Sequence, residues 1–194
     1  LGEGDALLKL GLPDVDRAIG GGVLPGEVIL IAGRPSHGKT MAGMQAIDSL
    51  AEVVPVLMIS EEMSKAAIAQ RALAGITVVP PCDWKKKKDA LHRDAAKHYG
   101  TRKAVVIVES CGTIERAIAA IEEACIEHTV GAVLIDYVQL LDGKGQGRYE
   151  QVSDVSKRLK RTAVACNVVM LALCQLNRGV ESRSTGTTGK PRTS

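Results

Sequence analysis

Aromatic residues are scarce in this sequence, whose 194 residues include no Phe, one Trp and three Tyr. We therefore expect no nucleic-acid surface built from stacked rings, so that any binding to a strand would depend on basic side chains at the phosphates. The five cysteines are scattered and form no Cys-x-x-Cys pair, which argues against a disulfide framework and a zinc site. No apolar run approaches the roughly 20 residues of a membrane span. These absences favour a cytoplasmic protein without a membrane partner.

The rest of the composition is that of one globular domain. Apolar residues make up 45% of the chain and charged residues 24%, and the length is sufficient for one buried core. The 25 basic and 22 acidic residues leave a net charge of +3, which permits a nucleic-acid partner without requiring one. The chain opens at Leu1 with no charged-then-apolar leader, so we expect a piece of a longer protein and no signal peptide.

Short apolar runs recur along the chain, and each is continuous rather than alternating. They span residues 28–32, 56–59, 105–108, 132–135 and 168–173. A strand that is apolar on both faces is typical of a parallel sheet covered by helices. Residues 113–128 and 151–167 carry apolar side chains at helical spacing between such runs. This alternation predicts an α/β fold with a mainly parallel sheet, in which ligands bind at the carboxyl ends of the strands.

The segment GRPSHGKT matches the phosphate-binding pattern G-x-x-x-x-G-K-[ST] in full. A predicted strand enters it and a predicted helix, residues 40–53, leaves it, so backbone N–H groups and a helix N-terminus would face a phosphate. Lys39 would reach the β- and γ-phosphates of ATP or another NTP, and Thr40 would ligate Mg²⁺ through its hydroxyl. The residues expected to bind nucleotide are Gly33, Arg34, Pro35, Ser36, His37, Gly38, Lys39 and Thr40.

Two further strands end in polar residues at the same edge of the predicted sheet. Asp136 closes the apolar run at 132–135, where a magnesium-binding partner of Thr40 would have to lie. The alternative for Asp136 is a simple helix cap or turn residue. Gln175 follows the last predicted strand, where its amide could hydrogen-bond a γ-phosphate and report its loss.

Two adjacent acids, Glu61 and Glu62, follow the strand predicted at 56–59. Hydrolysis requires a group that orients and deprotonates water, and we expect one of the two to be that general base. The alternative is that both are first-turn acids of a helix at 63–74, where the helix dipole favours negative charge.

In this order, the blocks resemble the RecA-type motor domain of the DnaB family of replicative helicases. The resembling blocks are GLPDVDRAIGGGVLPGE, GRPSHGKT, VLMISEEMS, AVLIDYVQLL and SDVSKRLKRTAVACNVVMLALCQLNRGVE. The resemblance implies a P-loop NTPase with a RecA-like core and a sheet order of 3-2-4-5-1. It also implies catalytic roles for Lys39, Glu62 and Gln175, with Thr40 and Asp136 as metal ligands.

The resemblance carries expectations for the whole protein as well. It implies a motor that hydrolyses ATP or another NTP, moves along single-stranded DNA and unwinds duplex as a hexameric ring, with a primase or a loader as a further partner. The chain, residues 1–194, would be one RecA-like ATPase domain. Its expected parts are a lead-in at 1–27, a core at 28–177 and a basic, mobile tail at 178–194.

The sequence also departs from the family pattern. His37 stands where the family usually has Met, Glu61 where it has Leu and Cys174 where it has Ser. The family continues beyond this chain into a DNA-gripping loop and strands that carry a trans-acting arginine finger, and it has an N-terminal collar domain. We therefore expect the isolated chain to be a weak or inactive motor.

Basic residues in two glycine-rich segments are the candidate DNA contacts. They are Lys144, Arg148, Arg178 and Arg183. The alternative is that both segments are solvated loops. The denser basic run at 85–88 is expected on an outer helix, where a solvated face is favoured over a nucleic-acid patch.

Functions of three classes are consistent with the sequence. The first is the helicase motor, whose ATPase activity DNA would stimulate. The second is another RecA-like ATPase, such as a recombinase or a clock-type ATPase. The third is a nucleotide-gated binding module that binds ATP without turnover.

Overall fold

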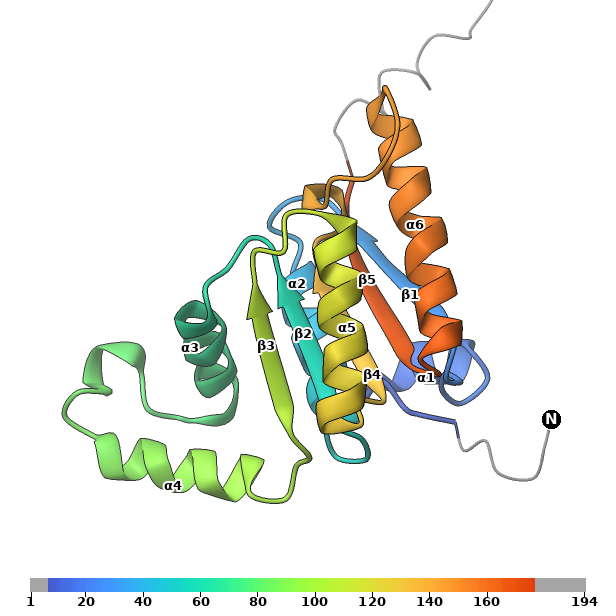
Figure 1. Ribbon diagram of the computed structural model, residues 1–194. Helices are drawn as coiled ribbons and strands as arrows, with labels where there is room; N and C mark the ends of the chain where they lie inside the picture. The colour runs from blue at the N-terminus through green and yellow to red at the C-terminus, as the bar shows by residue number, and fades with distance from the viewer. Residues whose placement is uncertain (1–6, 177–194) are drawn as a thin grey trace, which may run out of the picture.

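Five parallel strands form the sheet of the computed structural model, which describes residues 7–176 (Figure 1). They are β1 (Val28–Gly33), β2 (Val56–Ser60), β3 (Val105–Glu109), β4 (Ala132–Asp136) and β5 (Val169–Gln175). The strands lie in the order β1-β5-β4-β2-β3, and each neighbouring pair is parallel. This order confirms the predicted 3-2-4-5-1 arrangement, read from the opposite edge, and the predicted α/β class.

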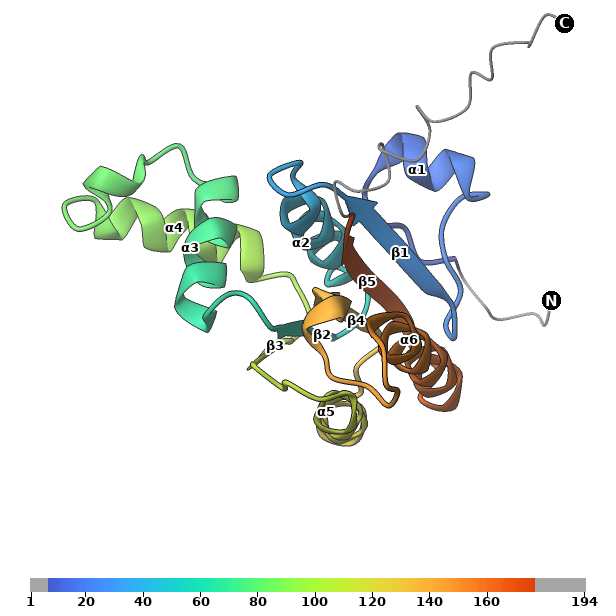
Figure 2. The same ribbon diagram turned by 90° about the horizontal axis from the view of Figure 1, so that it is seen from above.

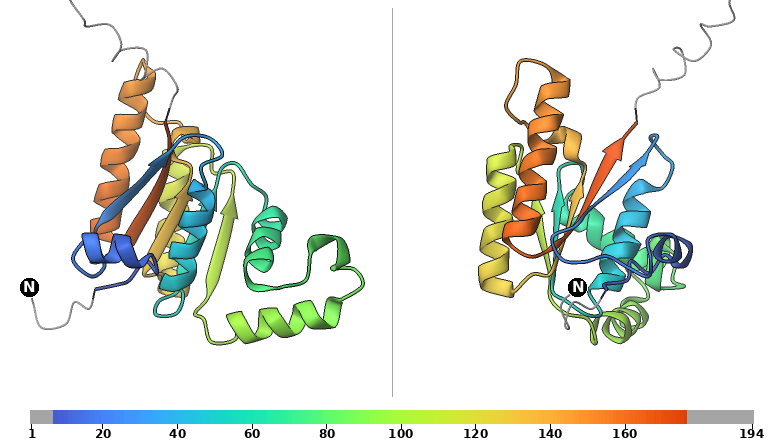
Figure 3. Two further views of the ribbon diagram at one scale, coloured as in Figure 1. Left: turned by 180° about the vertical axis from the view of Figure 1, so that it is seen from behind. Right: turned by 90° about the vertical axis from the view of Figure 1, so that its right-hand side faces the viewer.

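Helices cover both faces of this sheet. The α-helices are α1 (Pro13–Ala18), α2 (Lys39–Leu50), α3 (Lys65–Ile76), α4 (Lys88–Tyr99), α5 (Ile114–His128) and α6 (Arg148–Ala165), and single 3-10 turns form η1 (Pro81–Asp83) and η2 (Val138–Leu140). Seen from above, α5 and α6 lie on one face and α1 and α2 on the other (Figure 2). Seen from behind, α3 and α4 extend beyond the β3 edge (Figure 3, left).

The core has two halves because successive strand residues point to opposite faces of the sheet. In β4, Val133 and Ile135 belong to the cluster with α5 and α6, whereas Ala132 and Leu134 belong to the cluster with α2. Every residue of β4 is buried. The predicted continuous apolar runs are therefore explained, since strands in the middle of the sheet bury both faces. The edge strand β1 is more open, and Leu30 is 61% exposed.

The sequence predicts the start of α5 more accurately than the start of α6. The Thr113 hydroxyl accepts a hydrogen bond from the Arg116 N–H at 3.4 Å and so caps α5, which begins at the next residue, Ile114, one residue after the start of the predicted segment. Helix α6 begins at Arg148 rather than at the predicted residue 151 and ends at Ala165. Its first turn is polar, so apolar spacing alone could not locate this start.

The predicted lead-in contains a short helix. Helix α1 begins at Pro13, and the buried Asp16 carboxylate accepts a hydrogen bond from the Leu10 N–H at 2.8 Å. The tail predicted at 178–194 lies outside the described residues, which end at 176.

Residues 85–88 of the basic run are exposed, in and next to α4. None of the helices within residues 7–176 is long and apolar enough to cross a membrane.

A matched pair of leucines tests this arrangement of layers. We expect Leu134→Ala to lower the free energy of unfolding by about 3 kcal/mol, because Leu134 is fully buried in β4 and its truncation leaves a cavity. The same change at Leu30 on the open edge should cost less than about 1 kcal/mol. Urea unfolding of the two full-length variants measures both values. Equal losses would contradict the placement of Leu134 between two helical layers.

Candidate active site

The phosphate-binding segment forms a loop between β1 and α2. Ser36 and Gly38 both have positive φ, 62° and 78°, so the backbone turns sharply and Gly38 caps α2 in a left-handed conformation. A Cβ atom at Gly33 would lie 3.0 Å from Cγ of Lys39, so a larger residue there would crowd the lysine stem. The loop therefore has the backbone shape that its glycines predict.

Contacts within the loop hold its shape. The His37 N–H donates to the Arg34 carbonyl at 3.3 Å, and the His37 Nδ1 lies 2.9 Å from the Pro35 carbonyl. The Lys39 ammonium donates to the same Arg34 carbonyl at 3.0 Å. Because Gly38 has no side chain to cap α2, the first N–H groups of this 12-residue helix face the loop. The result is a cationic, N–H-rich concavity suited to an anion.

Asp136 lies beside this loop at the end of the central strand β4. Its side chain is 1% exposed and is hydrogen-bonded to Thr40, the second residue of α2. Its Oδ2 atom is buried without a hydrogen-bond partner among the described residues. Since buried polar atoms are normally paired, this orphaned oxygen indicates a ligand site rather than a helix cap.

The charges around Asp136 act on its protonation. Burial raises the pKa of this carboxyl above its ordinary value, and the negative charge of Glu62 adds to the increase. The Thr40 hydrogen bond and the positive charges of Lys39 and Arg71 oppose it without cancelling it. Arg71 on α3 was not expected here. A lone basic residue on a helical face carries no sequence signal of this kind.

The two adjacent glutamates have different surroundings. The Glu61 carboxylate accepts hydrogen bonds from the Cys111 N–H at 2.8 Å and the Gly112 N–H at 2.9 Å. Glu62 is exposed, and its charge acts on Asp136. Helix α3 begins only at Lys65, so neither glutamate lies in its first turn, and that alternative is wrong. Within residues 7–176, Glu62 is thus the more exposed of the two acids.

Gln175 lies at the end of β5, next to the start of the phosphate loop. It pairs with Gly33 of β1, and the Leu176 N–H donates to the Gly33 carbonyl at 3.0 Å. A residue that the sequence reasoning missed, Gln139 in η2, holds this strand end with both ends of its amide. Its Nε2 donates to the Gln175 carbonyl at 3.1 Å, and its Oε1 accepts from the Gln175 N–H at 3.2 Å.

The candidate DNA contacts are partly described. Lys144 and Arg148 are exposed, and Arg148 lines a cavity of about 410 Å³ together with Gln139 and Gln175. Tyr149, which is 88% exposed to solvent, lines the same cavity. The remaining two candidates, Arg178 and Arg183, lie outside the described residues. The structure thus brings one predicted DNA contact next to the predicted phosphate sensor.

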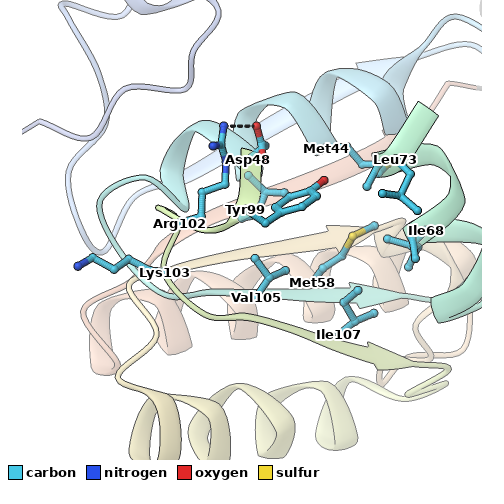
Figure 4. A pocket seen from close by; sticks show the side chains of 13 residues that line it. Met44, Asp48, Met58, Ile68, Leu73, Tyr99, Arg102, Lys103, Val105 and Ile107 are labelled. Atoms are coloured by element: carbon cyan, nitrogen blue, oxygen red, sulfur yellow. Dashed lines mark hydrogen bonds and ion pairs between the residues drawn. The ribbon is translucent and has the colours of Figure 1, made fainter. Parts of the chain in front are cut away.

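Another cavity, of about 450 Å³, lies between α2, α3 and the β3 edge and is lined mainly by apolar side chains (Figure 4). Met58 and Ile107 extend from the sheet toward it, and Ile68 and Leu73 from α3 (Figure 4). The guanidinium of Arg102 at its rim is already paired with Asp48 at 2.8 Å. Because this lining is mainly apolar, with its cations at the adjacent residues Arg102 and Lys103, the loop edge is the better candidate for a nucleotide site.

Known proteins similar to this chain share one domain. The family model of the DnaB-like helicase C terminal domain matches residues 8–194. The replicative DNA helicase DnaB of Synechocystis sp. is 30% identical over 201 residues, covering 91% of this chain and 22% of that protein. DnaB of Helicobacter pylori is 31% identical over 167 residues, covering 81% of this chain and 34% of its own. The chain therefore spans well under half the length of these curated relatives.

Solved structures extend the likeness to the fold. A DnaB-like replicative helicase, described with its interactions with primase, matches with a TM-score of 0.75 at 24% identity, over 91% of this chain and 45% of that one. A second solved structure, described as an ATPase domain, matches with a TM-score of 0.78 at 24% identity, over 94% of this chain and 68% of that one. The P-loop geometry, the strand order and the match over residues 8–194 lead to one conclusion: this chain belongs to the DnaB-like helicase C-terminal domain family.

Proposed function

We propose that this chain is the motor domain of a replicative DNA helicase, which hydrolyses ATP or another NTP to move along single-stranded DNA and unwind duplex. The observation that supports this most is the buried Asp136 carboxylate, whose Oδ2 has no partner among the described residues and which lies beside Thr40, Lys39 and Glu62. Membership of the DnaB-like family supports the same role.

The donor set at Asp136 fits Mg²⁺, which prefers hard oxygen ligands and keeps several of its waters. Thr40 supplies a hydroxyl and Asp136 a carboxylate whose Oδ2 is orphaned in the described chain. These two residues would hold the ion. When bound, Mg²⁺ neutralises phosphate charge and orients the γ-phosphate for attack.

The chain's own residues supply the remaining catalytic functions. The α2 N-terminus and the Lys39 ammonium would bind the β- and γ-phosphates, which requires Lys39 to leave the Arg34 carbonyl. Glu62 would accept a proton from the attacking water, because its carboxylate is exposed next to Asp136. Gln175, held by Gln139, would contact the γ-phosphate and respond to its loss.

The role proposed for the whole protein extends to its partners. We propose a homohexameric ring around single-stranded DNA in the cytoplasm, with Lys144 and Arg148 among the phosphate contacts. Primase is a natural partner, since one structurally similar helicase is described with its primase interactions. A loader is the other candidate partner.

ATP hydrolysis by the full-length protein tests the proposal directly. We expect single-stranded DNA to stimulate turnover, and we expect Glu62→Gln to lower kcat by about 10²–10⁴-fold, because general-base assistance is lost. Lys39→Ala should lower kcat/KM by at least about 10²-fold, because phosphate charge is no longer neutralised. Steady-state phosphate release with and without DNA measures both effects.

Exposed residues of the same type serve as controls. Lys85→Ala and Glu123→Gln make the same charge changes far from the site and should leave turnover unchanged. Turnover that is indifferent to DNA, with filaments visible by microscopy, would favour a recombinase-type ATPase. Tight ATP binding without turnover would instead favour a nucleotide-gated module.

The buried carboxylate predicts a trade between stability and function. Because the pKa of Asp136 is raised in the folded state, the folded protein binds this proton more readily, and the free energy of unfolding falls as pH rises above about 4. Asp136→Asn should therefore stabilise the nucleotide-free protein at pH 7 by about 1 kcal/mol while abolishing stabilisation by Mg²⁺-ATP.

Thermal unfolding at pH 5 and pH 8, with and without Mg²⁺-ATP, measures this trade. The exposed Asp89 on α4 provides the matched control, because Asp89→Asn makes the same charge change without burial. A destabilised Asp136→Asn protein that still responds to Mg²⁺-ATP would contradict the proposed ligand role.

Salt dependence tests the phosphate contacts. Lys144→Ala and Arg148→Ala should each reduce the slope of log affinity against log salt for single-stranded DNA by about 0.7, because each removes one phosphate contact. The exposed lysines of the basic run provide the control, and Lys85→Ala or Lys86→Ala should leave the slope unchanged. Fluorescence anisotropy of a labelled oligonucleotide over a salt series gives these slopes. The opposite pattern would move the DNA contacts to the α4 region.

A further inference from the structure

The proposed hydrolysis scheme gives no part to the Glu61 carboxylate, although this group is held by specific hydrogen bonds. It lies just beyond β2, is half-buried, and accepts from two successive backbone N–H groups, those of Cys111 and Gly112, at 2.8 and 2.9 Å. Ser110 and Gly112 have positive φ, 50° and 73°, so the turn after β3 presents its N–H groups on one side. Such a concavity binds anions, and here the anion belongs to the protein itself.

Glu61 is also tied to the central strand through its own backbone. Its N–H donates to the Asp136 carbonyl at 2.7 Å. On the other side of Glu62, the Met63 N–H donates to the Ser60 hydroxyl at 3.0 Å. The short segment that presents Glu62 is therefore fixed at the ends of both β2 and β4. The Glu61 carboxylate adds a third anchor, at the end of β3.

The turn that Glu61 binds is joined in turn to the candidate DNA loop. The Asp142 N–H donates to the Gly112 carbonyl at 2.8 Å, and the Ile114 N–H donates to the Asp142 carbonyl at 3.0 Å. Asp142 lies two residues before Lys144. One carboxylate thus links the segment of the proposed general base to the base of the loop that carries a proposed DNA contact.

We propose that Glu61 is a positioning residue that couples the DNA loop at 143–147 to the placement of Glu62. The inference rests on the proposed function, because it requires both a DNA contact in that loop and hydrolysis assisted by Glu62. DNA that shifts Asp142 displaces the turn at Gly112, and the two charge-assisted bonds transmit the displacement to the Glu61–Glu62 segment. The carboxylate supplies one oxygen to each of the two N–H donors, Oε1 to Cys111 and Oε2 to Gly112.

Substitutions at Glu61 test this coupling in the full-length protein. Glu61→Gln retains one acceptor oxygen and places an NH₂ group against a backbone N–H, and Glu61→Leu removes both acceptors. The quantity to measure is the ratio of kcat with single-stranded DNA to kcat without it. We expect the ratio to fall about tenfold in both variants, while the KM for ATP stays within about twofold of the wild-type value.

Asp16→Asn is the matched control for a purely structural role. The Asp16 carboxylate likewise accepts a hydrogen bond from a backbone N–H, that of Leu10. Asp16 lies in the lead-in, away from the loop edge. We expect Asp16→Asn to lower the melting temperature by about 2–4 °C with an unchanged stimulation ratio. If the Glu61 variants also lose only melting temperature and keep the ratio, the coupling role is overturned.

Hydrogen exchange of the unmodified protein gives a test that does not depend on variants. DNA binding should change the exchange rates of the Met63, Cys111 and Gly112 amides together. Rates that do not respond to DNA overturn the inference. The two proposals fail differently: an ATPase that DNA does not stimulate overturns both, whereas normal stimulation that survives Glu61→Gln overturns only the role of Glu61.

Discussion

The burial of one carboxylate at the end of the central strand is the constraint around which the candidate site is arranged. Asp136 is 1% exposed, and an unpaired carboxylate oxygen in such surroundings is unfavourable unless a ligand completes it. The groups that reduce this cost come from two parts of the chain: Lys39 and Thr40 at the start of α2, and Arg71 in α3. Each is held in place by a strand or helix whose apolar side packs elsewhere. The hydrophobic layers thus position the polar site.

Adjacent residues of identical chemistry have different surroundings at this edge. Glu61 is bound by two N–H groups of the neighbouring turn, whereas Glu62 is exposed beside Asp136. Both residues lie in the bend that follows β2, and Glu61 reaches the turn after β3. The sequence alone left both residues as candidates for the general base, because nothing in the letters Glu-Glu distinguishes an anchored carboxylate from a free one.

The features that could be predicted from the sequence are those encoded by neighbouring residues. The strand over 132–136 was predicted almost to the residue because it is apolar on both faces, and the phosphate loop because its pattern is contiguous. Strand order came only from the family resemblance, since apolar runs carry no information about their neighbours. The missed contacts join distant segments: Gln139 meets Gln175 36 residues away, and Glu61 meets Cys111 50 residues away. Such pairs depend on which strands lie side by side.

The position of β1 at the sheet edge also has a consequence for biosynthesis. Among the described strands β1 pairs only with β5, and Val28 meets Met170. A ribosome adding roughly 5–20 residues per second needs on the order of 10 s to synthesise the intervening chain. During that time the phosphate loop has emerged, but the strand that supports it has no partner. The strand that leads into the phosphate loop therefore gains its partner only when β5 inserts between β1 and β4, near the end of synthesis of the described residues.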